Sequence, residues 1–341
     1  MSKILVTGGL GFIGSHTVVE LINAGYEPVI VDNLSNSNPK ILDQLNKILG
    51  FKPVFYKLDL CHEHDIAELV DKEPELAGII HFAASKAVGE SVEKPLMYYK
   101  NNFLSLINVL NAYKGKKLNF VFSSSCTVYG QPDELPVTEK APIKTATSPY
   151  GNTKQVSEEI LQDVIASGSE YNIISLRYFN PVGAHQSALI GELPIGVPQN
   201  LVPFITQTAI GKRQKLTVFG NDYNTPDGSN VRDYIHVVDL AKAHVAALKH
   251  METAADFNGY DVFNIGAGKG SSVLEVIHAF EKTTGVKLNY EIGPRRPGDV
   301  EQVWGDVSKA AEKLQWKTGL DVDQMMLSAW NWEKYLKENP L

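Results

Sequence analysis

The sequence predicts an α/β protein with a doubly wound parallel sheet and a smaller C-terminal α/β domain. Two observations carry this prediction. Over residues 1–180, short apolar segments rich in β-branched residues alternate with longer segments of helical periodicity, as in a parallel sheet covered by helices on both faces. In addition, a glycine-rich turn, TGGLGFIG, joins the first predicted strand to the first predicted helix.

The predicted elements alternate along the chain. Residues 3–7 (KILVT) predict a buried strand, and 12–24 predict a helix that ends at Gly25, since glycine readily takes the left-handed conformation that follows a helix. Apolar runs predict further strands at 26–32, 52–59, 77–83, 119–125 and 172–180. Helical periodicity predicts the intervening helices at 63–73, 95–113 and 149–167.

The character of the chain changes after Asn180. Residues 181–235 contain many Pro, Gly and Asn residues and only short apolar segments. The segment 233–250, DYIHVVDLAKAHVAALKH, then predicts a strand followed by a helix that returns to the sheet. We therefore expect one domain from 1–180 together with 236–261, and a smaller one from 181–235 together with 262–341.

Composition and charge argue against several classes of protein. The chain has 341 residues and a net charge of -7, which is unfavourable for a nucleic-acid-binding surface. Its apolar runs are strand-sized, and the N-terminus begins a strand at once, so we expect no membrane span and no leader. The two cysteines, Cys61 and Cys126, do not make a disulfide framework and fit a reducing cytoplasm.

The glycine-rich turn predicts a dinucleotide site. It aligns as G-x-G-x-x-G from Gly9 or as G-x-x-G-x-x-G from Gly8, with Gly11 and Gly14 in both. Such glycines allow a tight turn and let a pyrophosphate approach the N-terminus of the following helix. Asp32 closes the second strand 18 residues after Gly14, where a carboxylate accepts hydrogen bonds from ribose hydroxyls and repels a 2′-phosphate. These features predict a Rossmann-like domain that binds NAD rather than NADP.

Tyr150 and Lys154, in SPYGNTK, indicate the chemistry. Residues four apart share one face of a helix, so the ammonium can lower the pKa of the phenol and make it a proton acceptor. Ser125 follows the fifth strand, at the carboxyl edge of the sheet, and can hydrogen-bond the reacting oxygen. With NAD, the three residues predict hydride transfer from a carbinol. The Tyr/Lys spacing alone more often marks an ordinary helix surface.

Longer motifs give the chain a family resemblance. It resembles the extended short-chain dehydrogenase/reductase superfamily in TGGLGFIG, in YGNTK and in the Ser125–Tyr150–Lys154 set. It is similar to the UDP-glucose 4-epimerase family over nearly its whole length, in HFAASKAVGESVEKP, RYFNPVGAH, GVPQNLVPFI, FGNDYNTPDGSNVRDYIHVVDLA and PRRPGDV. Two positions depart from the family pattern: Ala84-Ser85 precede Lys86 where Gly-Leu is frequent, and Val303 replaces a residue that is often larger.

The resemblance implies a mechanism. Tyr150, as phenolate, would take the proton of the 4-hydroxyl of UDP-galactose or UDP-glucose while carbon 4 passes hydride to tightly held NAD. Lys154 would lower the pKa of Tyr150 and bind the nicotinamide ribose, and Ser125 would bridge to the sugar oxygen. The 4-keto sugar would then turn its other face and take the hydride back. Related enzymes pair the helices at 95–113 and 149–167 between subunits, which implies a homodimer.

The resemblance also implies the ligand contacts. The predicted NAD contacts, besides Tyr150 and Lys154, are Gly8, Gly11, Phe12, Ile13, Gly14, Asp32, Asn33, Ser35, Asn36, Ser37, Asp59, Leu60, Phe82, Ala83, Lys86, Asn101 and Phe179. The predicted UDP-hexose contacts, besides Ser125 and Tyr150, are Asn180, Asn200, Thr217, Val218, Phe219, Arg232, Arg296, Asp299 and Val303. Arg232 and Arg296 suit a diphosphate because guanidinium forks match phosphate oxygens; each is otherwise a solvated surface charge. In this family a small residue at the position of Val303 implies that UDP-GalNAc and UDP-GlcNAc are also accepted.

Two other functions are compatible with the fold. A nucleotide-sugar 4,6-dehydratase needs an acid and a base for elimination, and related dehydratases carry Thr-Asp-Glu where this chain has Ser125-Cys126-Thr127. A non-catalytic NAD-binding sensor would not need the intact catalytic set.

The remaining polar residues are expected to be structural. His62 and His64 point to different faces of a helix, so we predict no metal site. His81 and His236 are expected in the core, and Cys126 is expected to be a packed thiol rather than a nucleophile. Asp59 is either an adenine contact or an aspartate that ends a strand.

Overall fold

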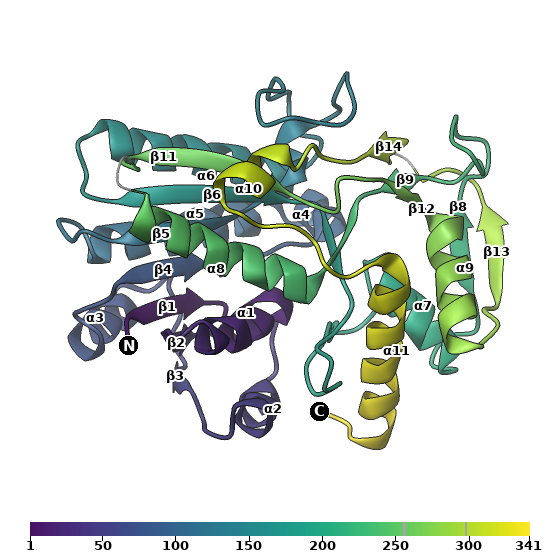
Figure 1. Cartoon of the computed structure of the whole chain (residues 1–341), viewed down its shortest axis with the longest axis horizontal. Helices are drawn as coiled ribbons and strands as arrows, with labels where there is room; N and C mark the ends of the chain where they lie inside the picture. Colours follow the sequence, from purple (N-terminus) through teal and green to yellow (C-terminus); the bar gives the residue numbers. More distant parts are fainter. Residues whose placement is uncertain (255–256, 297–298) are drawn as a thin grey trace.

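A seven-stranded parallel sheet forms the centre of the computed structural model, which describes residues 1–254, 257–296 and 299–341 (Figure 1). The strand order is β11-β6-β5-β4-β1-β2-β3 and every neighbouring pair is parallel. The strands are β1 (Lys3–Thr7), β2 (Glu27–Val31), β3 (Val54–Tyr56), β4 (Gly78–His81), β5 (Asn119–Ser125), β6 (Asn172–Tyr178) and β11 (Tyr260–Ile265). The chain order reverses between β1 and β4, which is where doubly wound sheets bind ligands. The predicted fold class is confirmed.

Helices cover both faces of this sheet. One face packs against α1 (Phe12–Asn23), α2 (Lys40–Leu49) and α8 (Val237–Thr253), and the other against α3 (Glu63–Lys72), α5 (Pro95–Ala112) and α6 (Pro149–Ala166). Ile4 and Val6 of β1 enter the first core and Leu5 enters the second, which explains why the strands read as continuous apolar runs. Within the described residues, no helix combines the length and the apolar character needed to cross a membrane.

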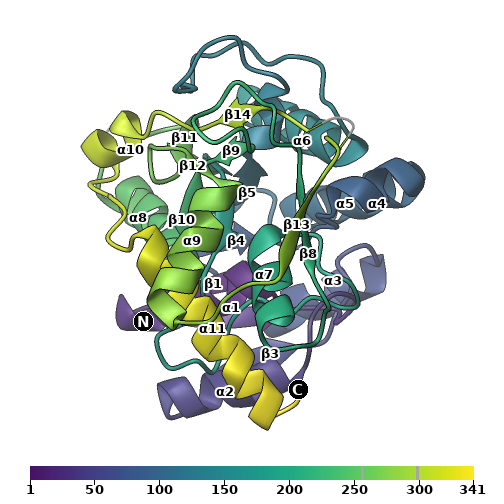
Figure 2. The ribbon, with the colours of Figure 1, turned by 90° about the vertical axis from the view of Figure 1, so that its right-hand side faces the viewer.

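A smaller group of elements stands at the carboxyl ends of the strands and faces the viewer in Figure 2. Its core joins α7 (Leu201–Ala209), α9 (Val273–Thr284), α11 (Val322–Glu338) and β8 (Leu216–Phe219), and β8 pairs with β13 (Tyr290–Gly293). Two short sheets link this group to the large sheet. They are β10 (Tyr234–His236) with β7 (Asn180–Val182), and β12 (Ser271–Ser272) with β9 (Val231–Arg232) and β14 (Gln302–Val303). Short helices lie at α4 (Val88–Glu93), η1 (Cys126–Tyr129) and α10 (Ser308–Lys313).

The structure differs from the predicted elements mainly at the edges of the sheet. The predicted strand 52–59 is only Val54–Tyr56, since this edge strand pairs on one side alone. Helices α2 and α4 are not predicted from the sequence. The predicted returning segment 236–261 contains α8, but β11 continues to Ile265 in the large sheet. The division into two domains remains a prediction.

Candidate functional site

The glycine-rich turn forms a cradle between β1 and β4. Gly8 has a φ of +67°, and a Cβ there would lie 3.0 Å from the nitrogen of Ala83. A Cβ at Gly14 would lie 2.3 Å from the carbonyl oxygen of Gly8, so helix α1 can approach the turn this closely only with glycine. The helix begins after Gly11, which provides no side-chain cap, and its first N–H groups therefore remain available to an anion. This arrangement fits the pyrophosphate of a dinucleotide.

Asp32 and Asp59 organise the next part of the edge. The buried Asp32 carboxylate accepts hydrogen bonds from Leu10 N at 3.1 Å, Leu34 N at 2.9 Å and Ser37 Oγ at 2.7 Å. It therefore orders the turn after β2 and the glycine-rich turn together. The predicted contacts Ser35 and Asn36 lie on the same turn and are exposed.

Asp59 is tied to the same turn rather than simply ending a strand. Its Oδ2 accepts from Asn33 Nδ2 at 3.0 Å and its Oδ1 from Cys61 N at 2.9 Å. Burial raises the pKa of Asp59, but the hydrogen bonds from Cys61 and Asn33 outweigh burial and leave this pKa below its ordinary value. The contact of Asp59 with the adenosine stays a prediction.

The remaining predicted cofactor residues surround the ends of β1, β4 and β6. Ala83 follows β4 and donates its N–H to Thr7 Oγ1 at 3.2 Å. Asn101 of α5 donates to Ser85 Oγ at 3.2 Å, and Phe179 follows β6 with its N–H bonded to Ile265 O at 3.2 Å. Lys86 is exposed, whereas Phe12, Ile13 and Phe82 are half-buried and Leu60 is buried.

Ser125, Tyr150 and Lys154 meet at the carboxyl end of β5. Ser148 caps α6 by accepting from Gly151 N, which places Tyr150 and Lys154 on the first turns of this helix. All three side chains are buried, with 7%, 9% and 4% of their surfaces exposed. Lys154 Nζ lies 5.9 Å from the centre of the Tyr150 ring and donates to Ser123 O at 2.6 Å. The Ser125 hydroxyl lies close enough to Tyr150 to lower its pKa.

The protein groups alone do not produce the activated phenol that the sequence predicts. Burial, together with Tyr178, raises the pKa of Tyr150 above that of free tyrosine, and the Ser125 hydroxyl opposes this only in part. Burial lowers the pKa of the Lys154 ammonium to about 7, although the Glu158 carboxylate acts in the opposite direction. The cause is desolvation, which disfavours the charged form of both groups. The lowering of the Tyr150 pKa by Lys154 stays a prediction.

The two serines before Ser125 have interior partners, as expected for structural residues. Ser123 Oγ hydrogen-bonds the hydroxyl of Tyr178, and Ser124 Oγ donates to Glu158 Oε1 at 2.5 Å. Ser125 Oγ accepts a 3.3 Å bond from the backbone of Thr127, and its hydroxyl also acts on Tyr150.

A buried ion pair, not predicted from the sequence, lies beneath these serines. Arg177 of β6 donates to Glu158 of α6, with Nη2 2.5 Å from Oε2 and Nε 3.0 Å from Oε1. This pair holds the helix of Tyr150 and Lys154 against β5 and β6. Glu158 lies four residues after Lys154 on the same helix face, which is a signal that could have identified it.

The predicted sugar-nucleotide residues fall into two groups. In the first, Arg232 of β9 is the register partner of Val303 of β14, and Asn180 of β7 is the partner of Tyr234 of β10. Val303 packs against the small apolar cluster of Val128, Tyr129 and Val137 that follows Ser125.

The second group lies on and beside β8. The Arg296 guanidinium stands 5.6 Å from the centre of the Phe219 ring and donates to Asp299 Oδ1 at 2.7 Å. Thr217 is half-buried, while Val218 is buried in the core.

Asn200, the residue before α7, contacts Glu192, which is not predicted from the sequence. Its Nδ2 donates to Glu192 Oε1 at 2.6 Å. Burial raises the pKa of Glu192, and the positive charge of Lys86 opposes this shift. Glu192 therefore lies between one predicted cofactor residue and one predicted sugar-nucleotide residue, but nothing in the loop sequence marks it.

Other polar residues behave structurally. His81 Nδ1 is 3.0 Å from Thr7 Oγ1, and His236 Nε2 is 3.1 Å from Ser328 Oγ. Burial raises the pKa of the Cys126 thiol to about 12, so it is not a reactive thiolate. His62 is mostly exposed beside Asp65, and the described part of the chain holds no group of three potential metal ligands.

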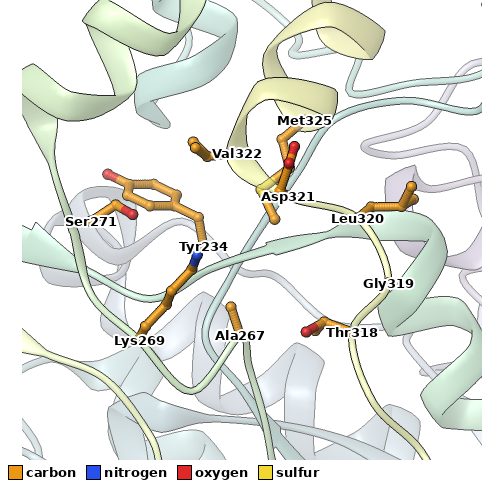
Figure 3. Close-up of a pocket in the computed structure, with 10 residues that line it drawn as sticks. All are labelled: Tyr234, Ala267, Lys269, Ser271, Thr318, Gly319, Leu320, Asp321, Val322 and Met325. Carbon is orange, nitrogen blue, oxygen red and sulfur yellow. The ribbon is translucent and has the colours of Figure 1, made fainter.

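Figure 3 shows a separate hollow of about 290 Å³. It is lined by Tyr234, Ala267, Lys269, Ser271 and residues 318–322 and 325, none of which belongs to either predicted ligand set. The hollow lies between β10, β12 and the start of α11.

Comparisons with known proteins cover nearly the whole chain. A family model described as GDP-mannose 4,6 dehydratase matches residues 5–328. The UDP-glucose 4-epimerase of Dictyostelium discoideum is 51% identical, over 97% of this chain and 95% of that protein.

Solved structures agree with the sequence comparison. The UDP-glucose-4-epimerase of Stenotrophomonas maltophila, crystallised with NAD and formylated UDP-arabinopyranose, is 45% identical with a TM-score of 0.94, covering 99% of both chains. The Bifidobacterium longum UDP-glucose 4-epimerase, crystallised with NAD+ and UDP, is 47% identical with a TM-score of 0.91, again covering 99% of both chains.

Proposed function

This chain belongs to the UDP-glucose 4-epimerase family of extended short-chain dehydrogenase/reductases, and from that premise we propose that it interconverts UDP-galactose and UDP-glucose with tightly bound NAD. The observation that carries the proposal is the buried meeting of Ser125, Tyr150 and Lys154 at the edge of the sheet that also holds the glycine cradle. The glycine cradle and Asp32 would hold NAD, which would supply reversible hydride transfer and the positive charge of its oxidised ring.

The chain's own residues would manage the proton and the orientation of the sugar. Tyr150 would accept the proton of the 4-hydroxyl, and Ser125 would hydrogen-bond the same oxygen. Positive charge at the site lowers the pKa of a buried phenol by favouring its ionised form. Burial lowers the pKa of Lys154 to about 7, so this side chain would gain or lose a proton near neutral pH. It can do so while it keeps its hydrogen bond to Ser123 O. Tyr150 would return the proton when the ketone is reduced.

Epimerisation further requires firm binding of the nucleotide and freedom for the sugar. Arg232 and Arg296 are the proposed partners of the diphosphate. Arg232 lies on β9 and Arg296 lies beside β8, so the two side chains would hold the UDP from different segments. The ketone could then turn between two faces while the nucleotide remains in place.

Elimination chemistry is not favoured. A dehydratase needs carboxylates next to the reacting carbons, whereas β5 ends at Ser125 and is followed by Cys126 and Thr127. The thiol of Cys126 has a raised pKa and is a poor substitute for a carboxylic acid.

An assay of the purified protein with UDP-galactose, UDP-glucose, UDP-GalNAc and UDP-GlcNAc, without added NAD, tests the proposal. We expect UDP-galactose and UDP-glucose to interconvert. A protein that retains bound NAD but converts none of the four would overturn the epimerase function and favour a non-catalytic sensor.

We further propose that N-acetylated UDP-sugars are substrates. Val303 is small and half-buried beside the apolar cluster that follows Ser125, which leaves room for a substituent on carbon 2. Val303→Tyr is expected to reduce UDP-GalNAc conversion by about 1–3 kcal/mol in transition-state binding, the cost of overfilling a packed site, and to spare UDP-galactose. Steady-state kinetics on both substrates measure this, and equal losses on both would refute the role of Val303.

The proposed assembly is a homodimer formed through α5 and α6. Leu96 is 82% exposed and Met97 is 39% exposed at the start of α5, while Phe103 and Ile107 are half-buried further along the helix. These apolar side chains provide the surface on which a second copy would pack.

We place the protein in the cytoplasm, since Cys61 and Cys126 are both free thiols.

A further inference from the structure

Asp233 occupies an unusual junction in the fold. It is the single residue between β9 and β10, and it is fully buried. Its N–H donates to Val303 O at 3.1 Å, and its carbonyl oxygen accepts from Asn180 N at 3.0 Å. The main chain of Asp233 therefore binds both short sheets that carry Asn180, Arg232 and Val303.

The side chain of Asp233 connects the same junction to two further segments. Its Oδ1 accepts from Ala267 N at 2.6 Å, and its Oδ2 accepts from Gly268 N at 3.2 Å and Gly305 N at 3.3 Å. Residues 267 and 268 belong to the loop that leaves β11, the edge strand of the large sheet. One carboxylate thus joins the large sheet to the two small ones.

The carboxylate is held at an energetic cost. The backbone N–H groups of Ala267, Gly268 and Gly305 stabilise its ionised form, and the charge of Lys269 adds to this effect without a direct contact among the described residues. Burial raises the pKa of Asp233 to about 7, against the opposing effect of those N–H groups. Burying a carboxylate without a direct ion pair costs free energy. Three hydrogen bonds from N–H groups offset this cost only when the donors are held in a well-defined geometry.

The surrounding glycines show how closely the segments approach this carboxylate. A Cβ at Gly266 would lie 2.4 Å from Asp233 Oδ2. A Cβ at Gly305 would lie 2.4 Å from Cε2 of Phe179, so the segment that Asp233 binds also packs against a predicted cofactor contact. Movement of the carboxylate would therefore move the walls of the ligand site.

We propose that Asp233 is a positioning residue for nucleotide-sugar binding. Its main chain binds Asn180 and Val303, and its carboxylate fixes this junction, with the adjacent Arg232, to the segments of Ala267, Gly268 and Gly305. The proposal rests on the proposed function, because it takes UDP as the ligand of Arg232. Asp233 itself does not touch the substrate. Its role is to hold the adjacent Arg232 in the orientation that receives a diphosphate.

Asp239 offers a matched control. It is 3% exposed, and its Oδ2 accepts from Gly319 N at 2.8 Å and Leu320 N at 2.9 Å. It is thus another buried carboxylate that binds a loop through backbone N–H groups, but the loop carries none of the predicted ligand contacts. Loss of stability alone should follow from Asp239→Asn, whereas loss of UDP affinity should follow from Asp233→Asn.

The test measures UDP binding to the purified holoenzyme by calorimetry, together with KM and kcat for UDP-galactose. Asp233→Asn should raise the Kd for UDP by about tenfold or more, because small displacements of positioning groups are costly. It should raise KM more than it lowers kcat, and it should leave the NAD content unchanged. Asp239→Asn should change the Kd for UDP less than about twofold, even if it lowers the Tm as much as Asp233→Asn does. A loss of stability alone leaves the ligand-binding groups in place.

A second variant guards against misfolding. Gly266→Ala keeps the carboxylate but displaces it, and it should raise the Kd in the same direction. If wild type binds UDP and both Asp233→Asn and Gly266→Ala bind it equally well, the positioning role is wrong and the proposed function stands. If wild type itself does not bind UDP, the proposed function fails and this inference fails with it.

Discussion

At the scale of single residues, the sequence identifies the reacting groups but not their electrostatic state. The i,i+4 spacing of Tyr150 and Lys154 correctly places both on the first turns of one helix. It does not reveal that both side chains are buried, because burial depends on β5, β6 and the serines beneath them. Desolvation then raises the pKa of the phenol and lowers that of the ammonium, which is opposite to the change expected from the pair alone.

Tyr150→Phe tests the acid–base role. Removal of the phenolic oxygen should lower kcat by about 10²–10⁴-fold, the usual range for a lost general acid–base group, while NAD remains bound. Tyr171→Phe is a suitable control, since Tyr171 is also buried but donates its hydroxyl to Leu110 O, away from the site. Steady-state kinetics and the content of bound nucleotide measure both effects. A Tyr150→Phe enzyme with near wild-type kcat would exclude Tyr150 as the base.

The lowered pKa of Lys154 predicts a pH dependence of stability. Burial brings this pKa from 10.5 to about 7, so between these values the folded protein binds fewer protons at Lys154 than the unfolded chain. The free energy of unfolding should therefore rise with pH across this window by the contribution of Lys154. Lys154→Met should lack that contribution. Urea denaturation of the NAD-free forms at pH 7, 8 and 9 measures the difference between them, and a difference that does not grow with pH would contradict the shift.

At the scale of elements, central strands are predicted well and peripheral elements poorly. Strands 3–7 and 119–125 match β1 and β5 because both faces are buried and the apolar run defines the strand. At the edge, β3 keeps only three residues of its apolar run. The amphipathic α2 follows the polar turn SNSNP, which obscures its beginning, although Gly50 ends it in the left-handed conformation. Likewise, β11 joins the large sheet from a distant part of the sequence, which no local pattern reveals.

The contact between the glycine-rich turn and helix α1 gives a prediction at this scale. Gly14→Ala would place a methyl group 2.3 Å from the carbonyl oxygen of Gly8, forcing the helix away from the turn. Such overpacking costs about 1–3 kcal/mol, and we expect the purified variant to carry far less NAD. Gly89→Ala is the control, because the atom nearest to its added Cβ is 4.0 Å away. Absorbance of nucleotide released on denaturation measures the NAD content, and equal contents would contradict the cradle.

At the scale of the whole molecule, the sequence predicts the ligand class but not the arrangement that binds it. A net charge of -7 is unsuited to an anionic substrate, and the predicted diphosphate partners Arg232 and Arg296 come from segments far apart in the chain. The connections that do this are non-local. Asp233 binds residues 267, 268 and 305, and the sequence around it resembles an ordinary end of a strand. Such contacts follow from the assembled fold and have no periodicity to read.

The proposed homodimer is also a property of the whole molecule. Replacing Leu96 and Phe103 together by glutamate would put charge into an apolar contact and should shift the protein from dimer to monomer. Ile292→Glu, on β13, is the control, because this side chain is 48% exposed but lies outside α5 and α6. Light scattering coupled to size-exclusion chromatography measures the mass. A wild-type protein that is monomeric at micromolar concentration would refute the dimer.

The most direct measurement of the central claim follows the hydrogen at carbon 4. UDP-galactose carrying deuterium at this position is converted in ordinary water by the purified protein, and the UDP-glucose product is examined by NMR and mass spectrometry. Transient oxidation at carbon 4 with return of the same hydride predicts inversion with the deuterium fully retained at carbon 4. Loss of deuterium to solvent would contradict this mechanism, and its appearance at carbon 6 of a dehydrated product would indicate elimination instead.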